Sequence, residues 1–232
     1  AETVEYELSE AEQNLYEEVS TYVRDEMNRA DAVAQAGDKK RGNNIGFALT
    51  ILQRRLASSP EAILRSLERR QERLELRVRE ETLSEEISRI RNTSIEEIDS
   101  ISPEDYDEEL TSAEREAFEE KLDELVDLAT AARTIEELKV EIEVLKNLVT
   151  LARKVRHLDI DRKWLELSGL LQDNLLLGET DGKLHKIIIF TEHKDTLRYL
   201  EEKIKNLIGR DEAVVTIHGG TKRFERKQVQ EQ

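Results

Sequence analysis

The sequence contains no cysteine, only two prolines and nine glycines, and aromatic residues make up 4% of its 232 positions. Without cysteine the chain cannot form disulfides, bind zinc through thiolates or use a thiol nucleophile. We expect no membrane span, because no run of about 18 apolar residues occurs. The acidic N-terminus AETVEYELSE lacks the apolar core of a signal peptide. These absences favour a cytoplasmic protein and exclude collagen-like, proline-rich and aromatic-rich β-sandwich architectures.

Charged residues make up 38% of the chain, a composition typical of long amphipathic helices. The formal net charge is −16, but it is unevenly distributed. Residues 39–80 hold 11 Lys/Arg and 5 Asp/Glu, whereas residues 92–127 hold 2 and 15. The net charge disfavours whole-molecule attraction to nucleic acid, whereas the basic stretch still allows local phosphate contacts.

Helix start signals recur along the first three quarters of the chain. Ser9-Glu10-Ala11-Glu12 and Thr134-Ile135-Glu136-Glu137 are capping boxes, and Ser59 before Pro60 predicts a third helix start. Turn residues at 36–44 separate the first two helices. A heptad-like seam begins at Ile135, and its length of about two and a half heptads favours antiparallel packing against the preceding helix over a free coiled coil.

Two segments before residue 178 are not predicted to be helical. Residues 3–8 alternate polar and apolar side chains, which predicts a short strand with no adjacent partner. Residues 92–109 include Pro103 and are rich in acids, which predicts a solvated linker.

The C-terminal quarter has a different pattern. Two short apolar runs, 186–191 and 213–217, flank an amphipathic helix at 195–208, which predicts a βαβ unit with parallel strands. A two-stranded parallel sheet is marginal alone, so we expect missing strands. The expected fold class is therefore mainly α: an antiparallel bundle of long helices, followed by a truncated α/β unit.

The segments IIIFTEHKDTLRYLEEKI and VVTIHGGTKRFERKQVQ resemble the start of the second RecA-like domain of superfamily 2 helicases and Swi/Snf-like ATPases. FALTILQRRLASSPEAILRSLERRQERLE resembles the helical spacer of that family, and YELSEAEQNLYEEVSTYV resembles the exit from its first motor lobe. The resemblance implies that residues 1–8 end the first lobe, 9–178 form the spacer, and 183–232 begin a RecA-like domain.

The same resemblance implies a parent nucleic-acid-dependent ATPase that uses ATP and Mg²⁺ and contains the remaining motor lobes. We favour DNA over RNA as its nucleic acid, and the sequence leaves both open. The chain departs from that family because it has no GxxxxGK[ST] sequence, no acidic box and no arginine-finger segment. We therefore expect a fragment that is not catalytic and holds no cofactor itself. Its expected role is inter-lobe spacer and nucleic-acid contact module.

Candidate nucleic-acid contacts fall into two groups. The first follows the predicted strands, where a glycine turn can offer backbone amides to a phosphate or simply connect a strand to a helix; it comprises Thr191, His193, His218, Gly219, Gly220 and Arg223. The second is an arginine series that either tracks phosphates or, as we favour, pairs with interleaved glutamates or with the acidic stretch 92–127; it comprises Arg54, Arg55, Arg65, Arg69, Arg70 and Arg73.

A rival interpretation is a helical scaffold for protein–protein interaction, since long charged helices with apolar seams often serve that purpose. The two interpretations differ in salt dependence: phosphate binding weakens steeply with salt, whereas association through an apolar seam does not. The four histidines show no metal-ligand spacing, so we expect no metal site.

Overall fold

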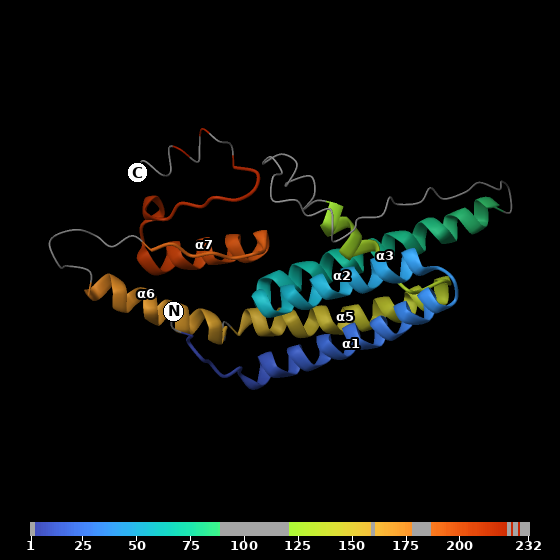
Figure 1. The fold of residues 1–232 in the computed structure, drawn as a ribbon, viewed down its shortest axis with the longest axis horizontal. Coiled ribbons are helices and arrows are strands. Elements are labelled where there is room, and N and C mark those ends of the chain that lie inside the picture. The colour runs from blue at the N-terminus through green and yellow to red at the C-terminus, as the bar shows by residue number, and fades with distance from the viewer. Residues whose placement is uncertain are drawn as a thin grey trace.

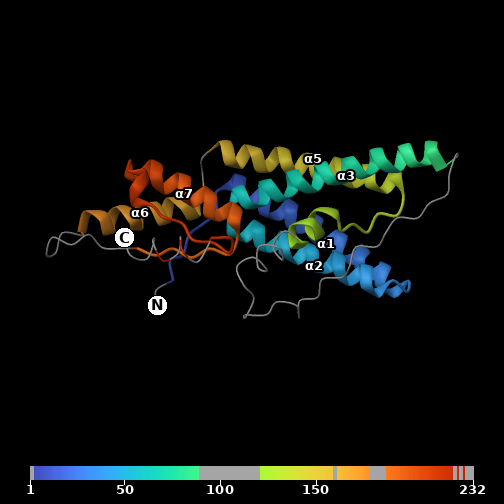
Figure 2. The same cartoon turned by 90° about the horizontal axis from the view of Figure 1, so that it is seen from above.

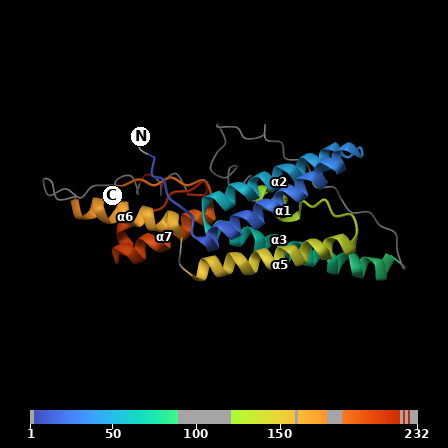
Figure 3. The same cartoon turned by 90° about the horizontal axis from the view of Figure 1, so that it is seen from below.

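The computed structural model describes residues 3–88, 121–158, 161–177, 187–221, 224 and 227. Four long helices form an elongated antiparallel bundle (Figure 1): α1 (Glu10–Gln35), α2 (Lys39–Ser58), α3 (Pro60–Ser88) and α5 (Ile135–His157). Seen from below, α1 and α2 make one layer and α3 and α5 the other (Figure 3). None of the helices in the described part of the chain is long and apolar enough to cross a membrane.

Helices begin at all three predicted start signals, and the predicted capping box is complete at Ser9 but only half formed at Thr134. The Ser9 hydroxyl accepts from the Glu12 amide at 3.3 Å while the Glu12 carboxylate accepts from the Ser9 amide at 2.8 Å, a complete capping box. Ser59 caps α3 by accepting from the amide of Ala62 at 3.1 Å, and Thr134 caps α5 by accepting from the amide of Glu137 at 3.2 Å. The predicted break between the first two helices is confined to residues 36–38.

The bundle core is one continuous apolar cluster contributed by all four helices and by the helical segment 121–128. The seam of α5 is buried as predicted, with Leu138, Leu145 and Ala152 almost fully enclosed. The seam of α5 packs mainly against α3, however, and not against the helix that precedes it in the sequence. Antiparallel ion pairs set the register between these two helices: Arg153 with Glu68 at 2.7 Å, and Arg156 with Glu61 at 2.6 Å.

Two helices lie together at one end of the bundle, α6 (Arg162–Leu177) and α7 (Lys194–Ile208), followed by the short 3₁₀ helix η2 (Asp211–Ala213) (Figures 1 and 2). Trp164 and Leu171 of α6 and Ile204 of α7 form a second, smaller apolar cluster. Ile189 and Val214, from the extended segments on either side of α7, pack against this cluster.

The predicted βαβ unit is wrong: the described residues contain no β-strand, and the fold there is all-α. Segments 187–190 and 214–218 are extended but form no ladder. α6 and α7 cover only one face of them, so the other face leaves Ile188 76% and Phe190 89% exposed. A parallel pair requires cover on both faces, and two segments alone cannot supply it.

The strand expected at residues 3–8 is also absent, because these residues run as an extended segment without a strand partner. The predicted acidic linker at 92–109 lies outside the described residues.

Candidate functional site

The bundle has two ends with different surroundings. At the junction end, α2 ends, α3 begins, and both meet α7. At the distal end, the turn 36–38 joins α1 to α2 and the segment 130–134 leads into α5. The 29-residue α3 is about 43 Å long at 1.5 Å per residue, so the ends are well separated.

Hydroxyl groups connect the helices at the junction end. The Thr196 hydroxyl, in the first turn of α7, lies 2.7 Å from that of Ser58 and 2.9 Å from that of Ser59. Ser59 also caps α3, so one small polar cluster joins the end of α2, the start of α3 and the start of α7. Thr196 and Ser59 are both buried, which makes these hydrogen bonds costly to lose.

Ion pairs extend the same junction. Arg69 of α3 donates to the carboxylate of Asp195 on α7 at 3.1 Å and lies 3.7 Å from that of Asp127. Arg54 of α2 pairs with Glu192, just before α7, at 2.8 Å. One hydroxyl cluster and two ion pairs therefore hold α7 and the residues just before it against the bundle.

Two titratable groups at this junction have altered pKa values. Burial raises the pKa of Asp127 to about 6, because the nearby charges of Arg69 and Arg55 offset only part of the desolvation cost. Burial, and after it the charge of Arg55, lowers the pKa of His193, so its ring is neutral at pH 7. Among the described residues, neither the Oδ1 atom of Asp127 nor the Nε2 atom of His193, both buried, has a hydrogen-bond partner.

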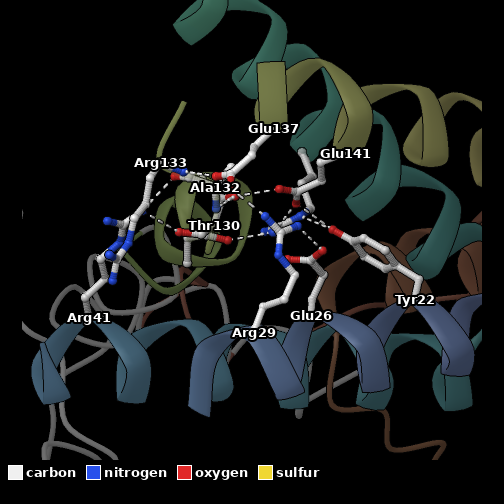
Figure 4. Close-up of polar contacts among 11 residues, drawn as sticks. Tyr22, Glu26, Arg29, Arg41, Thr130, Ala132, Arg133, Glu137 and Glu141 are labelled. Atoms are coloured by element: carbon white, nitrogen blue, oxygen red, sulfur yellow. Dashed lines mark hydrogen bonds and ion pairs between the residues drawn. The ribbon is translucent and has the colours of Figure 1, made fainter. Parts of the chain in front are cut away.

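Between the two ends lies a buried polar network that the sequence did not reveal (Figure 4). The guanidinium of Arg70 is 1% exposed and pairs with the Glu141 carboxylate at 2.8 Å, while the Tyr22 hydroxyl donates to that same carboxylate at 2.8 Å. Arg70 also donates to the backbone carbonyls of Val126 and Ala129. These bonds fix the segment 126–130 across the bundle.

The network keeps Glu141 ionised. Burial alone would raise the pKa of this carboxyl, but the charge of Arg70 and hydrogen bonds from Thr130 and Tyr22 outweigh burial and hold the pKa below its ordinary value. The spacing of Ile63, Leu67, Arg70 and Leu74 in α3 is that of core positions, a signal in the sequence that Arg70 is buried. No such signal identifies Glu141 as its partner, 71 residues away.

The arginine series is largely occupied with partners inside the chain. Arg70 and Arg69 are paired as described, Arg55 is buried and pairs with Asp123, Arg54 pairs with Glu192, and Arg65 pairs with Glu61 at 2.8 Å. Pairing was the outcome favoured from the sequence. The nucleic-acid role of Arg54, Arg55, Arg69 and Arg70 stays a prediction, and in this arrangement no phosphate can reach the enclosed guanidinium of Arg70.

The strand-end candidates are placed on both sides of α7. Thr191 and His193 precede α7, and His193 is its N-cap residue without capping it through its side chain. His218 opens a turn with Gly219 and Gly220, and the Gly220 amide donates to the Nδ1 atom of His218 at 3.1 Å. That amide, predicted to hold a phosphate, is therefore engaged within the turn. Arg223 lies outside the described residues.

The described part of the chain contains no group of three or more histidine and carboxylate side chains placed to hold a metal ion. Comparisons of the chain with models of protein families, with curated protein sequences and with solved structures find no match.

Proposed function

We propose that the chain is a rigid helical spacer within a nucleic-acid-dependent ATPase, and that it holds the segment 187–221 in a fixed position at one end of the bundle. The observation that carries the proposal is the junction: Thr196, Arg69 and Arg54 link α7 to α2 and α3 by hydroxyl contacts and ion pairs. A spacer needs such a connection, because motion at the junction would uncouple the two parts.

Aromatic residues add to the rigidity. The Tyr199 hydroxyl of α7 donates to Asp161, just before α6, at 2.9 Å, and the guanidinium of Arg156 at the end of α5 lies 5.6 Å from the centre of the Tyr199 ring. Tyr199 is 4% exposed, so these contacts are shielded from solvent. The bundle, α6 and α7 thus converge on one side chain.

The class of parent protein follows from the sequence resemblance alone. A spacer role requires no hydrolysis by this chain, which agrees with the absence of the phosphate-binding and arginine-finger motifs. The spacer role also does not depend on the predicted βαβ unit, which is absent from the described residues.

Double electron–electron resonance between two spin labels tests the rigidity of the junction between the bundle and α7. The chain has no native cysteine, so Asn147→Cys on α5 and Asn206→Cys on α7, both exposed, give a clean label pair. We expect one narrow distance distribution, broadened by Thr196→Val, with Thr150→Val on the exposed side of α5 as the matched control. A broad distribution in the chain without Thr196→Val contradicts the spacer role.

The second candidate is a protein–protein scaffold, favoured by exposed apolar side chains on the bundle. Val140 and Val144 lie one turn apart on α5 and are 65% and 39% exposed; Leu76 and Leu83 lie two turns apart on α3 and are 45% and 57% exposed. Sedimentation velocity at several salt concentrations separates this candidate from the first. A scaffold that self-associates through apolar contacts should remain associated as the salt concentration rises.

A further inference from the structure

Four arginines gather at the distal end of the bundle, and we call them the distal basic cluster: Arg41 of α2, Arg73 and Arg77 of α3, and Arg133 just before α5. Arg77 follows Arg70 by seven residues and therefore lies on the same face of α3, the face that contacts the segment 126–133. Arg73 lies one turn before Arg77. Arg41 donates to the carbonyls of Thr130 at 3.1 Å and Ala132 at 2.8 Å, on the same segment.

Arg41 is repelled by two other members of the cluster. Burial, and after it the positive charges of Arg77 and Arg133, lower the pKa of the Arg41 guanidinium, and the carboxylates of Asp38 and Glu137 act in the opposite sense without cancelling the effect. Figure 4 shows Arg41 and Arg133 on the same side of the segment 130–133. Two backbone carbonyls hold Arg41 in this position, so the repulsion is built into the fold and an anion would relieve it.

The carboxylates nearby are already engaged. Asp38 caps α2 by accepting from the Arg41 amide at 3.1 Å, and Glu137 accepts from the Arg133 amide at 2.6 Å. Glu81 pairs with Arg77 at 2.6 Å. Within the described ranges, no carboxylate comes within 4.0 Å of the guanidinium nitrogens of Arg41, Arg73 or Arg133, and the last two are exposed.

We infer that the distal basic cluster is a contact surface for the phosphate backbone of double-stranded DNA. The inference deepens the proposed function, since it rests on nucleic acid being the partner, and it moves the contact away from the paired arginines of the junction end. The guanidinium groups come from three separate elements and form an open surface, which suits successive phosphates of a backbone better than one enclosed phosphate ion.

Duplex is favoured over single strand by the side chains that surround the cluster. Proteins that hold single strands without sequence preference stack bases on exposed aromatic side chains. The exposed aromatic residues in the described part of the chain are Tyr6, Phe190 and Phe224, and none of them belongs to the elements that carry the distal basic cluster. The distal end therefore offers cations without a stacking platform.

Fluorescence anisotropy with a labelled duplex of about 20 base pairs tests the inference, with the salt concentration varied from about 25 to 200 mM. The test variant is Arg73→Gln with Arg133→Gln, two exposed side chains. The matched control is Lys146→Gln with Arg153→Gln, which removes the same charge from α5 side chains that are 45% and 58% exposed and paired with glutamates. Circular dichroism checks that both variants fold.

We expect the slope of log K against log salt to be about −3 for the unsubstituted chain and to fall in magnitude by about 2 in the test variant. The control should keep at least two thirds of that slope, and single-stranded DNA of the same length should bind more weakly than duplex. Equal losses in the two variants overturn the inference, because they report net charge rather than a site.

Three other results also overturn it: no binding by the unsubstituted chain at 25 mM salt, equal binding of a poly-glutamate peptide, or displacement of the duplex by inorganic phosphate at constant ionic strength. These failures are distinguishable from failure of the spacer role. The width of the distance distribution between the spin labels on α5 and α7 tests the junction alone. It does not depend on whether the distal end binds DNA.

Discussion

The two ends of the bundle use arginine differently. At the junction end, Arg55 and Arg69 each face a carboxylate from another element, and Arg69 reaches across to Asp195 on α7. At the distal end, Arg41 meets backbone carbonyls and Arg133 has no carboxylate within ion-pair distance among the described residues. A paired cation fixes two elements to each other, whereas an unpaired one keeps its charge for an external anion. The facing element, rather than the arginine itself, decides which role results.

The largest effect is expected midway between the ends. Arg70→Met leaves the carboxylate of Glu141 buried without its cation, so we expect the free energy of unfolding to fall by about 3–5 kcal/mol. Urea unfolding followed by circular dichroism measures it. The double variant Arg70→Met with Glu141→Leu should lose less than the sum of the two single variants, because it also removes the buried charge. A loss below about 1 kcal/mol for Arg70→Met would contradict the burial of this pair.

A glycine pair in α2 tests how tightly the distal end is packed. A Cβ atom on Gly42 would lie 2.7 Å from both the carbonyl oxygen of Ala30 and the Cβ atom of Ala34 in α1, whereas one on Gly46 meets nothing within 4 Å. Gly42→Ala should therefore lower the free energy of unfolding by about 1–3 kcal/mol. Gly46→Ala, the matched control, should raise it by about 0.5–1 kcal/mol. If Gly42→Ala raised the free energy of unfolding as Gly46→Ala does, α1 and α2 would not approach closely here.

Asp127 makes the junction end sensitive to pH. Its pKa is raised to about 6 in the folded chain from an ordinary 3.8, so the folded chain binds this proton more tightly than the unfolded chain does. The charged carboxylate therefore destabilises the fold, fully above about pH 6 and not at all once the pH falls well below 4. We expect Asp127→Asn to raise the free energy of unfolding by about 1–2 kcal/mol at pH 8 and to change it little near pH 3.5.

Asp123→Asn is the control for this prediction. Asp123 is partly exposed and pairs with Arg55, and its charge also contributes to the raised pKa of Asp127. Losing this charge removes the ion pair together with that repulsion, so we expect a clearly smaller gain in stability at pH 8 than for Asp127→Asn. A gain for Asp127→Asn that is the same at both pH values would mean that the buried charge is not its source.

The helix starts could be predicted because their determinants are local. The capping box at Ser9 and the cap at Ser59 involve residues within three positions of each other, and both form as expected. The extended segments around α7 have the composition of strands, but a ladder depends on what covers their second face. That cover is not a property of the segments themselves, so Ile188 and Phe190 remain exposed instead of forming a buried strand.

The candidate sites show the same limit. The tendency of the arginine series to pair was predictable from its interleaved glutamates, and Arg65 with Glu61 is such a local pair. The partners that separate the two ends of the bundle are distant in sequence: Asp195 lies 126 positions from Arg69, and the carbonyl of Thr130 lies 89 positions from Arg41. The sequence could list the cations but not divide them into paired and unpaired sets.

The smallest effect is expected for Arg54→Ala at the junction end, and it is the most informative for the comparison. Arg54 and Glu192 are 61% and 54% exposed, so solvent screens their ion pair and we expect the free energy of unfolding to change by about 0–1 kcal/mol. Because Glu192 already neutralises Arg54, we also expect the salt slope for duplex binding to change by well under 1, against a change of about 2 for Arg73→Gln with Arg133→Gln. A comparable loss of slope would mean that the duplex displaces Glu192 from Arg54. In that case the junction end would bind DNA as well, and the role predicted for Arg54 from the sequence would hold despite its internal partner.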